Sequence, residues 1–372
     1  MKKCRLPLVV AVFLVISAGI SIGQETFVNS TKPVAANAGR VITPTEVLII
    51  EDSGEKYYFK YPNALKTGPD GSIFVIDENQ FLQFDKAGKF LRNLFKKGQG
   101  PGEMTRMQNF AFFEGAAIAF SDYPPKLVWF DGAGKSFKNA SLNPKYRFLR
   151  FHGRIGRRWV FETYDFPAHS GDPAYIEHSD QLLAWDEPVN DWMPLSAFPV
   201  QIYVVSPGAF FDVGNFLAVP FGDRYLAISH TPDYLIKIFD VDTNRVVHSF
   251  RRNYERVPPP PLKPGQHPPT ISVNGKSFMA PESKYANDVS NILVRGDRLW
   301  VITSTVDKKK GVVVDIFDGE GIYRDSFYLN LPEPALNAIR FPLKSALTED
   351  ALLMIEWNDE GTFAIKKYKI EE

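Results

Sequence analysis

The sequence has 372 residues, of which 44% are hydrophobic and 14% aromatic, and this content excludes an intrinsically disordered chain. Lysine plus arginine and aspartate plus glutamate each number 43, so the formal net charge is +0. A neutral chain lacks the positive field that attracts the phosphate backbone of a nucleic acid. We therefore expect no nucleic-acid partner.

The start of the chain has the three-part layout of a signal peptide over residues 1–23. A basic stretch at Lys2–Arg5 is followed by an apolar run at Leu6–Ile20 and then by small residues at Ser21 and Gly23. The apolar run is shorter than the roughly 20 residues that a membrane-spanning helix needs. We therefore expect cleavage after Gly23, a mature chain that begins at Gln24 and has no membrane span, and a periplasmic or secreted location.

The only cysteine, Cys4, lies within this signal. The mature chain would therefore contain no disulfide, no thiolate nucleophile and no cysteine-ligated zinc. Its stability would have to come from its hydrophobic core. We expect residues 24–40 to form a flexible N-terminal segment and residues 41–372 to form a single domain.

Downstream of the signal, short alternating strands recur between turns rich in Gly, Pro, Asp and Asn. The clearest marker is an aromatic residue followed by aspartate: Phe84-Asp85, Phe130-Asp131, Trp185-Asp186, Phe239-Asp240 and Phe317-Asp318. Aspartate opens such turns by bonding its own backbone, and a following glycine supplies the positive φ that closes them. Another strand precedes each marker: Ser72–Asp77, Ala117–Asp122, Arg158–Thr163, Tyr225–His230 and Leu299–Ser304. Each unit is a meander typical of one β-propeller blade.

A sixth unit follows, with strands predicted at Ala351–Trp357 and Thr362–Ile370. This unit lacks a fourth strand, whereas an apolar strand at Glu46–Ile50 precedes the first unit without a partner. Pairing the two would close the ring and remove two exposed strand edges, which otherwise promote aggregation. The sequence therefore predicts an all-β fold: a six-bladed β-propeller of four-stranded antiparallel blades, closed by an N-terminal strand that joins the C-terminal blade.

Two segments carry a resemblance to a known family. The run Gly98–Glu103 reads Gly-Gln-Gly-Pro-Gly-Glu, and Asn287-Asp288-Val289 leads into the strand Leu299–Ser304. Both are similar to segments of the NHL-like six-bladed propellers found in many exported bacterial proteins. The resemblance implies the fold but no activity, because the members share a repeat and not a chemistry. The glycine-rich run lacks the strand-to-helix context of a phosphate-binding loop, so we interpret it as a tight corner whose Glu103 caps neighbouring amides.

Propeller sites usually lie where loops and strand ends surround the central channel. The last residues of the recurring strands are therefore the candidate ligand-binding ring: Asp77, Asp122, Thr163, His230, Ser304 and Glu356. Three carboxylates, a histidine and two hydroxyls could converge on the axis and hold calcium, which prefers oxygen ligands. In the alternative interpretation, each carboxylate bonds the turn that follows its own strand. No other cofactor is expected.

Two long insertions are further candidates for function. The excursion over residues 256–285 is proline-rich, and it is either an arm that grips a partner or a connection wrapped over the ring. The insertion Asp165–Ser179 holds His169 and His178 near acidic residues. It is either a zinc site or, as we favour, a solvated polar loop.

No common catalytic motif is present, since the sequence has no Gly-x-Ser-x-Gly elbow, no P-loop and no His-Glu-x-x-His. We therefore predict an exported, monomeric binding module that engages a protein or glycan partner through one face of the ring, and we favour a non-enzymatic role. The alternative is a propeller enzyme of the lactonase or lyase type with a metal in the central channel.

Overall fold

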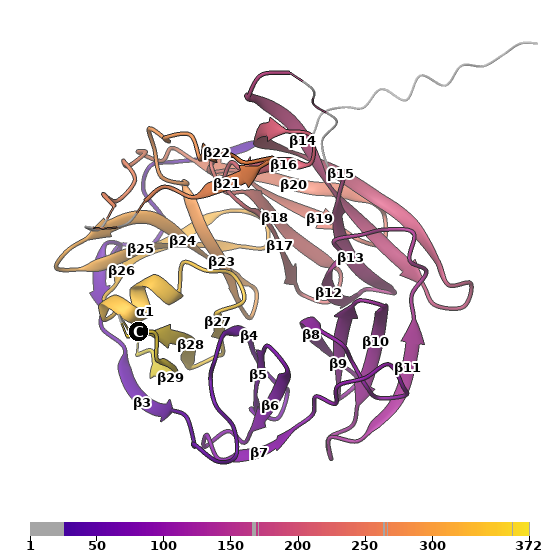
Figure 1. Cartoon of the computed structure of the whole chain (residues 1–372). Helices are drawn as coiled ribbons and strands as arrows, with labels where there is room; N and C mark the ends of the chain where they lie inside the picture. Colours follow the sequence, from indigo (N-terminus) through magenta and orange to yellow (C-terminus); the bar gives the residue numbers. More distant parts are fainter. Residues whose placement is uncertain are drawn as a thin grey trace, which may run out of the picture.

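The computed structural model describes residues 26–371, except 166–168, 170, 263, 264, 266 and 359. Six β-sheets stand around a ring, and one edge strand of each sheet lies nearest the centre (Figure 1). The predicted six-bladed β-propeller is therefore confirmed. The predicted signal peptide, residues 1–23, lies outside the described residues. In the described part of the chain, no helix has the length and apolar character needed to cross a membrane.

The first three blades are antiparallel meanders that follow the chain from the centre outward. Blade 1 contains β4 (Pro62–Thr67), β5 (Ile73–Asp77), β6 (Gln80–Phe84) and β7 (Phe90–Asn93). Blade 2 contains β8 (Met107–Phe113), β9 (Ala116–Asp122), β10 (Pro125–Phe130) and β11 (Ser136–Ser141). Blade 3 contains five strands, β12 (Arg150–Ile155), β13 (Arg158–Tyr164), β14 (Ala174–Asp186), β15 (Asp191–Ser206) and β16 (Ala209–Asp212).

The last three blades each take one strand from the N-terminal part of the chain. Blade 4 contains β17 (Phe216–Phe221), β18 (Tyr225–His230), β19 (Ile236–Asp240), β20 (Arg245–Arg252) and β1 (Phe27–Asn29). Blade 5 contains β23 (Val289–Arg295), β24 (Arg298–Asp307), β25 (Gly311–Asp318), β26 (Tyr323–Leu329) and β2 (Arg40–Ile42). Blade 6 contains β27 (Ser345–Leu347), β28 (Ala351–Trp357), β29 (Phe363–Lys369) and β3 (Thr45–Ile50). Outside the blades lie the hairpin of β21 (Thr270–Val273) and β22 (Lys276–Met279), and the helix α1 (Glu333–Ala338).

The ring closes as the sequence predicts. Strand β3 pairs antiparallel with β29, with Ile50 opposite Ile365 and Leu48 opposite Lys367, and so supplies the outer strand of blade 6. This pairing joins the two ends of the ring and covers the edge of β29 that would otherwise be open. Three blades, however, have five strands where four are predicted.

The hydrophobic core is divided into six clusters, and each cluster fills the gap between two neighbouring blades. Between blades 2 and 3, for example, the rings of Trp129 and Trp159 meet edge to face, with centroids 5.5 Å apart. The gap between blades 6 and 1 is filled in the same way by Ile355 and Val75. Because every blade is packed on both sides, inner strands are buried on both faces, and every residue of β5 and β6 is buried.

The turns follow the predicted chemistry. In the turn after β6, the Asp85 carboxylate accepts hydrogen bonds from the backbone N–H groups of Ala87 and Lys89, each at 2.9 Å, and Gly88 has a φ of 81°. In the corner between blades 1 and 2, Glu103 Oε2 accepts a hydrogen bond from the backbone N–H of Gly100 at 2.9 Å. The interpretation of that run as an inter-blade corner is therefore confirmed.

The N-terminal segment requires a correction, because residues 26–40 do not form the flexible stretch that we predicted. Strand β1 runs parallel to β20 of blade 4, and β2 runs parallel to β26 of blade 5. Asn29, the last residue of β1, is 6% exposed and bonds to blade 5. Its amide donates a hydrogen bond to Gly321 O at 2.9 Å, and its Oδ1 accepts one from Tyr323 N at 2.8 Å. The segment therefore ties the outer edges of two blades together.

Candidate functional site

The six predicted ring residues all lie on one face of the propeller. Each stands at or near the end of the second strand of its blade. Because consecutive strands are antiparallel, the first strand of each blade begins on that same face. We call it the entry face, since each blade's first strand is entered from there.

Five of the six side chains bond to the segment that leads into, or begins, the first strand of the same blade. Asp77 accepts hydrogen bonds from the backbone N–H groups of Lys60 and Tyr61, both at 2.7 Å. Asp122 accepts one from the Gln108 side chain at 2.8 Å. The other three bond to backbone carbonyl oxygens: Thr163 to Arg147 at 2.6 Å, His230 to Val213 at 2.8 Å, and Ser304 to Asn287.

The sixth residue, Glu356, instead accepts a hydrogen bond from the Tyr368 hydroxyl at 2.6 Å. Among the described residues, no hydrogen bond or ion pair joins any two of the six. The carboxylates also differ from our alternative interpretation, because the described hydrogen-bond partners of Asp77, Asp122 and Glu356 lie outside the turn that follows each strand. Calcium stays a prediction, and the described residues contain no cluster of three His, Cys, Asp or Glu that could hold a metal.

A groove of about 1630 Å³ opens on the entry face. Its walls come from blades 3, 4, 5 and 6, from the proline-rich excursion and from α1. Two of the predicted ring residues, His230 and Ser304, line it. The aromatic side chains of Tyr175 and Phe341 also line it and are each 50% exposed.

One wall of the groove exists because β14 and β15 run past the end of β13. Tyr164, the last residue of β13, pairs with Asp180, so Ala174–Ser179 pairs with β15 alone. On the other side of β15, strand β16 ends at Asp212. Because strand side chains alternate, His178 and Asp180 point to the same face. We call these segments the blade-3 extension: residues 174–180, residues 200–204 and β16.

The extension corrects the prediction of a polar loop at Asp165–Ser179, because the last part of that insertion is strand. Among the described residues, its two histidines belong to no cluster of three side chains that could hold a metal. His169 bonds through Nε2 to the Asp172 carbonyl oxygen at 2.8 Å, whereas His178 lies within β14.

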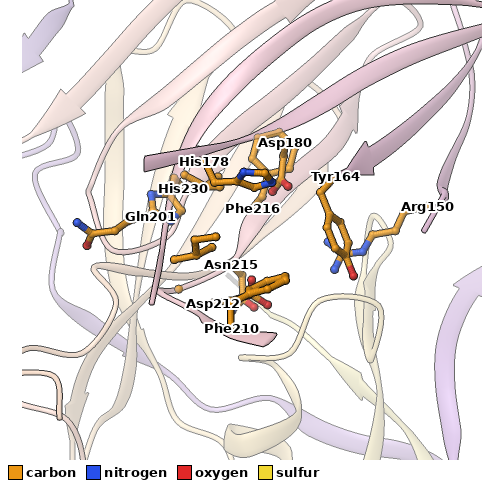
Figure 2. A pocket seen from close by; sticks show the side chains of 13 residues that line it. Arg150, Tyr164, His178, Asp180, Gln201, Phe210, Asp212, Asn215, Phe216 and His230 are labelled. Atoms are coloured by element: carbon orange, nitrogen blue, oxygen red, sulfur yellow. The ribbon is translucent and has the colours of Figure 1, made fainter. Parts of the chain in front are cut away.

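A smaller pocket of about 40 Å³ lies between the blade-3 extension and blade 4 (Figure 2). It shares several lining residues with the groove and is therefore continuous with it: Val200, Gln201, Asp212, Gly214, Asn215 and His230. The remaining lining residues belong to the pocket alone: Arg150, Tyr164, His178, Asp180, Ile202, Phe210 and Phe216. The pocket thus combines charged, aromatic and apolar side chains from seven strands, β12 to β18.

An ion pair occupies one side of this pocket. Arg150 Nη1 lies 2.7 Å from Glu162 Oε1, and His152 Nε2 lies 3.2 Å from Glu162 Oε2. Glu162 is 2% exposed, so its charge is balanced within the protein by Arg150. Glu162 offsets the charge of Arg150, although Arg150 still lowers the pKa values of Asp180 and Asp212.

Two further carboxyl groups in the pocket have raised pKa values. Burial raises the pKa of Asp180 to about 7, and the nearby charge of Glu162 adds to the effect. Burial also raises the pKa of Asp212, although Arg150 and the histidines oppose this. Burial lowers the pKa of His230, which favours its neutral form. Burial is the largest cause of all three directions and outweighs the nearby opposite charges.

The polar groups of the pocket include atoms without a protein partner. The Nε2 atom of His178 is buried, and none of the described residues forms a hydrogen bond with it. Within the described part of the chain, no group donates a hydrogen bond to the carboxylate of Asp180 or Asp212 either. Asp180 is partly exposed and Asp212 is exposed, whereas the His178 Nε2 atom is buried. Buried polar atoms are rarely left unsatisfied in folded proteins, so His178 Nε2 calls for a water molecule or a ligand.

Sequence reasoning missed most of this pocket. It selected His230 from the strand ends and His178 from the insertion, but not Asp180, Asp212 or Arg150. The available signal was the alternation His178-Ser-Asp180 inside a long β-prone run, which places two titratable side chains on one face. The contribution of β16 depends on tertiary pairing and left no comparable signal.

Comparisons with known proteins agree with the fold. Residues 53–185 match the DUF5128 family model, described as a 6-bladed beta-propeller. No curated protein matches the chain. A crystal structure of a protein from Bacteroides fragilis NCTC 9343, described as exported, has 12% sequence identity and a TM-score of 0.51, covering 93% of this chain and 100% of that chain.

Two other solved structures are more distant. A DUF4221-family member from Bacteroides vulgatus has 10% identity and a TM-score of 0.48, covering 90% of this chain and 99% of its own. A gluconolactonase from Xanthomonas campestris has 11% identity and a TM-score of 0.40, covering 92% and 99%. At such identities the similarity defines the fold alone. The chain is a six-bladed β-propeller, similar over residues 53–185 to the DUF5128 family, and the finer NHL-like resemblance stays a prediction.

Proposed function

We propose that this propeller is an exported, monomeric binding module that holds a protein or glycan partner in the groove of its entry face. The groove itself is the observation that carries the proposal. Its volume of about 1630 Å³ exceeds the range of about 300–1,000 Å³ that is usual for small-molecule pockets. An extended macromolecular segment therefore suits it better than a metabolite.

The composition of the groove supports the same proposal. Half-exposed aromatic side chains such as Tyr175 and Phe341 offer large rigid contact surfaces, as binding interfaces typically do. Charged side chains from separate blades, including Glu177, Arg256 and Arg340, provide polar contacts around them. The loops that carry these residues stand on rigid blades, which is the usual arrangement of binding sites on a β scaffold.

Two observations support export. The predicted signal at residues 1–23 favours a periplasmic or secreted protein. The Bacteroides fragilis protein with the same fold is described as exported. N-terminal sequencing of the protein from its native host tests this part, with Gln24 as the expected first residue.

The alternative is a propeller enzyme of the lactonase or lyase type with a channel metal. One observation favours an enzyme: Asp180 has a pKa of about 7 and lies in a pocket, as a general acid or base working near neutral pH would. Metal analysis of the purified protein discriminates between the two, because stoichiometric calcium or zinc supports the enzyme and its absence supports the binding module.

The groove is tested by partner capture with matched variants. Ser283→Trp places an indole at the exposed groove rim, and Tyr175→Ala removes an aromatic contact surface. Asp297→Ala is the control, because Asp297 is 81% exposed in the turn between β23 and β24, on the opposite face. Immobilised wild-type protein is exposed to an envelope extract of the native host and to a glycan array.

We expect one protein or glycan to be retained by the wild type and by Asp297→Ala, and to be lost with both groove variants. Retention by all four proteins, or loss with the control alone, would contradict the groove as the binding site. Circular dichroism of each variant verifies that the fold is intact.

A further inference from the structure

We infer that the pocket at the end of the groove binds the ε-ammonium group of a lysine side chain presented by a partner protein. This inference rests on the proposed function, because the pocket opens into the groove that would hold the partner. It adds the chemical identity of the anchoring group and selects a protein over a glycan.

The size of the pocket decides between possible cationic groups. A cavity of about 150 Å³ holds a benzene ring, whereas this pocket measures about 40 Å³. A six-membered sugar ring therefore does not enter it. The end of a lysine side chain is a linear chain of methylene groups with a compact ammonium head, and it fits such a narrow space.

The hydrogen-bonding groups of the pocket match an ammonium ion. A lysine ammonium has three N–H donors and no acceptor. The pocket offers three acceptors without donors among the described residues: the carboxylates of Asp180 and Asp212, and His178 Nε2 in the tautomer with its proton on Nδ1. In Figure 2 the two aspartate side chains lie above and below the space that the lining residues enclose.

The charge balance of the pocket points the same way. Glu162 is already paired with Arg150, so this pair adds no net charge. Asp180 and Asp212 have no such partner, which leaves an excess of negative charge. Aromatic rings at the walls, Phe210 and Phe216 among them, add a surface that favours cations and the methylene stem.

Raised pKa values support this geometry. Burial disfavours the ionised form of Asp180 in particular, and a bound ammonium would stabilise that form. Binding should therefore weaken as the pH falls from 8 to 6, because Asp180 becomes protonated. A pH series must consider every titratable or charged group that lines the pocket or is joined to Arg150 through hydrogen bonds. These groups come from five strands: Arg150 and His152 from β12, Glu162 and Tyr164 from β13, His178 and Asp180 from β14, Asp212 from β16, and His230 from β18.

The test uses n-butylammonium chloride as a mimic of the lysine side chain. Its binding to the mature chain is measured by saturation-transfer NMR at pH 8, with 1-butanol as the neutral analogue and glucosamine as the amino sugar. Asp212→Asn and Asp180→Asn remove one charge-assisted hydrogen bond each. Asp186→Asn is the matched control, because Asp186 is an exposed residue at the other end of the same strand as Asp180.

We expect millimolar binding of n-butylammonium, at least about 10-fold weaker with either pocket variant and unchanged with the control, and no binding of 1-butanol. No binding by the folded wild type, or equal weakening by Asp186→Asn, would overturn the inference. Glucosamine binding as tightly as n-butylammonium would overturn the choice of lysine. None of these results bears on the groove, which is judged separately by Ser283→Trp and Tyr175→Ala.

Discussion

Replacing Asp180 with asparagine should make the protein more stable at pH 8. The carboxyl group of Asp180 lies in the pocket beside blade 4, and burial raises its pKa to about 7 from an ordinary value of 3.8. Above pH 4 the unfolded chain ionises this group easily, whereas the folded chain keeps the proton until about pH 7. Asparagine has nearly the same shape and never ionises, so it avoids this cost.

The size of the effect follows from the pKa. Each unit of pKa difference corresponds to about 1.4 kcal/mol, and the difference here is about three units. The sign is fixed by linkage: between pH 4 and pH 7 the folded state binds more protons, so the stability of the wild type falls as the pH rises through this window. At pH 8 the variant should gain up to about 4 kcal/mol, and at pH 4 the two proteins should be equally stable.

Urea denaturation at pH 4, 6 and 8 measures this gain in the free energy of unfolding. Asp186→Asn, from the exposed end of the same strand, serves as the control and should change little at any pH. A variant that is less stable than the wild type at pH 8, or a gain that does not grow with pH, would refute the reasoning. A confirmed gain would indicate that the wild type keeps a destabilising carboxylate for a function.

Three other outcomes are expected. Asp315→Ala should lower the free energy of unfolding, measured by urea denaturation, by about 3–5 kcal/mol. The substitution removes the fully buried carboxylate that lies 2.7 Å from Arg252 between blades 4 and 5, and so leaves Arg252 without its ion-pair partner. A loss below about 1 kcal/mol would contradict this. Deleting residues 41–50 should expose the edge of β29, lower the melting temperature and promote aggregation, and an unchanged melting curve would disprove ring closure by β3. EDTA should not change the melting temperature of the wild type or of Asp77→Asn, because the Asp77 carboxylate is hydrogen-bonded to backbone N–H groups. A lower melting temperature of the wild type in EDTA would instead reveal a stabilising metal.

Most of the fold could be predicted because its signals are local. Strand β18 matches the prediction at Tyr225–His230 and β28 matches it at Ala351–Trp357, since alternation and turn residues mark both ends. The closing strand β3 could be predicted from an unpaired apolar run at one end and a missing strand at the other. By contrast, β1 is three residues long and pairs with a strand more than 200 residues away, so no periodicity reveals it.

The candidate site could be predicted only in part. His230 stands at a strand end that the repeat identifies, and the structure places it between the groove and the pocket. Asp212 reaches the pocket because β16 pairs with β15 beyond the end of the blade, and this register is a tertiary feature. The ring residues lie on one face, yet the bonding partners of five of them lie in the chain that enters or begins each blade, and a strand-by-strand interpretation does not show these partners.

The central claim, that the entry-face groove holds the partner, is tested most directly by site-specific photo-cross-linking in the native host. A photoreactive amino acid is placed at Ser283 on the groove rim in one protein and at Asp297 on the opposite face in another. We predict a discrete cross-linked adduct from position 283 and none from position 297. The same adduct from position 297, with none from 283, would contradict the account.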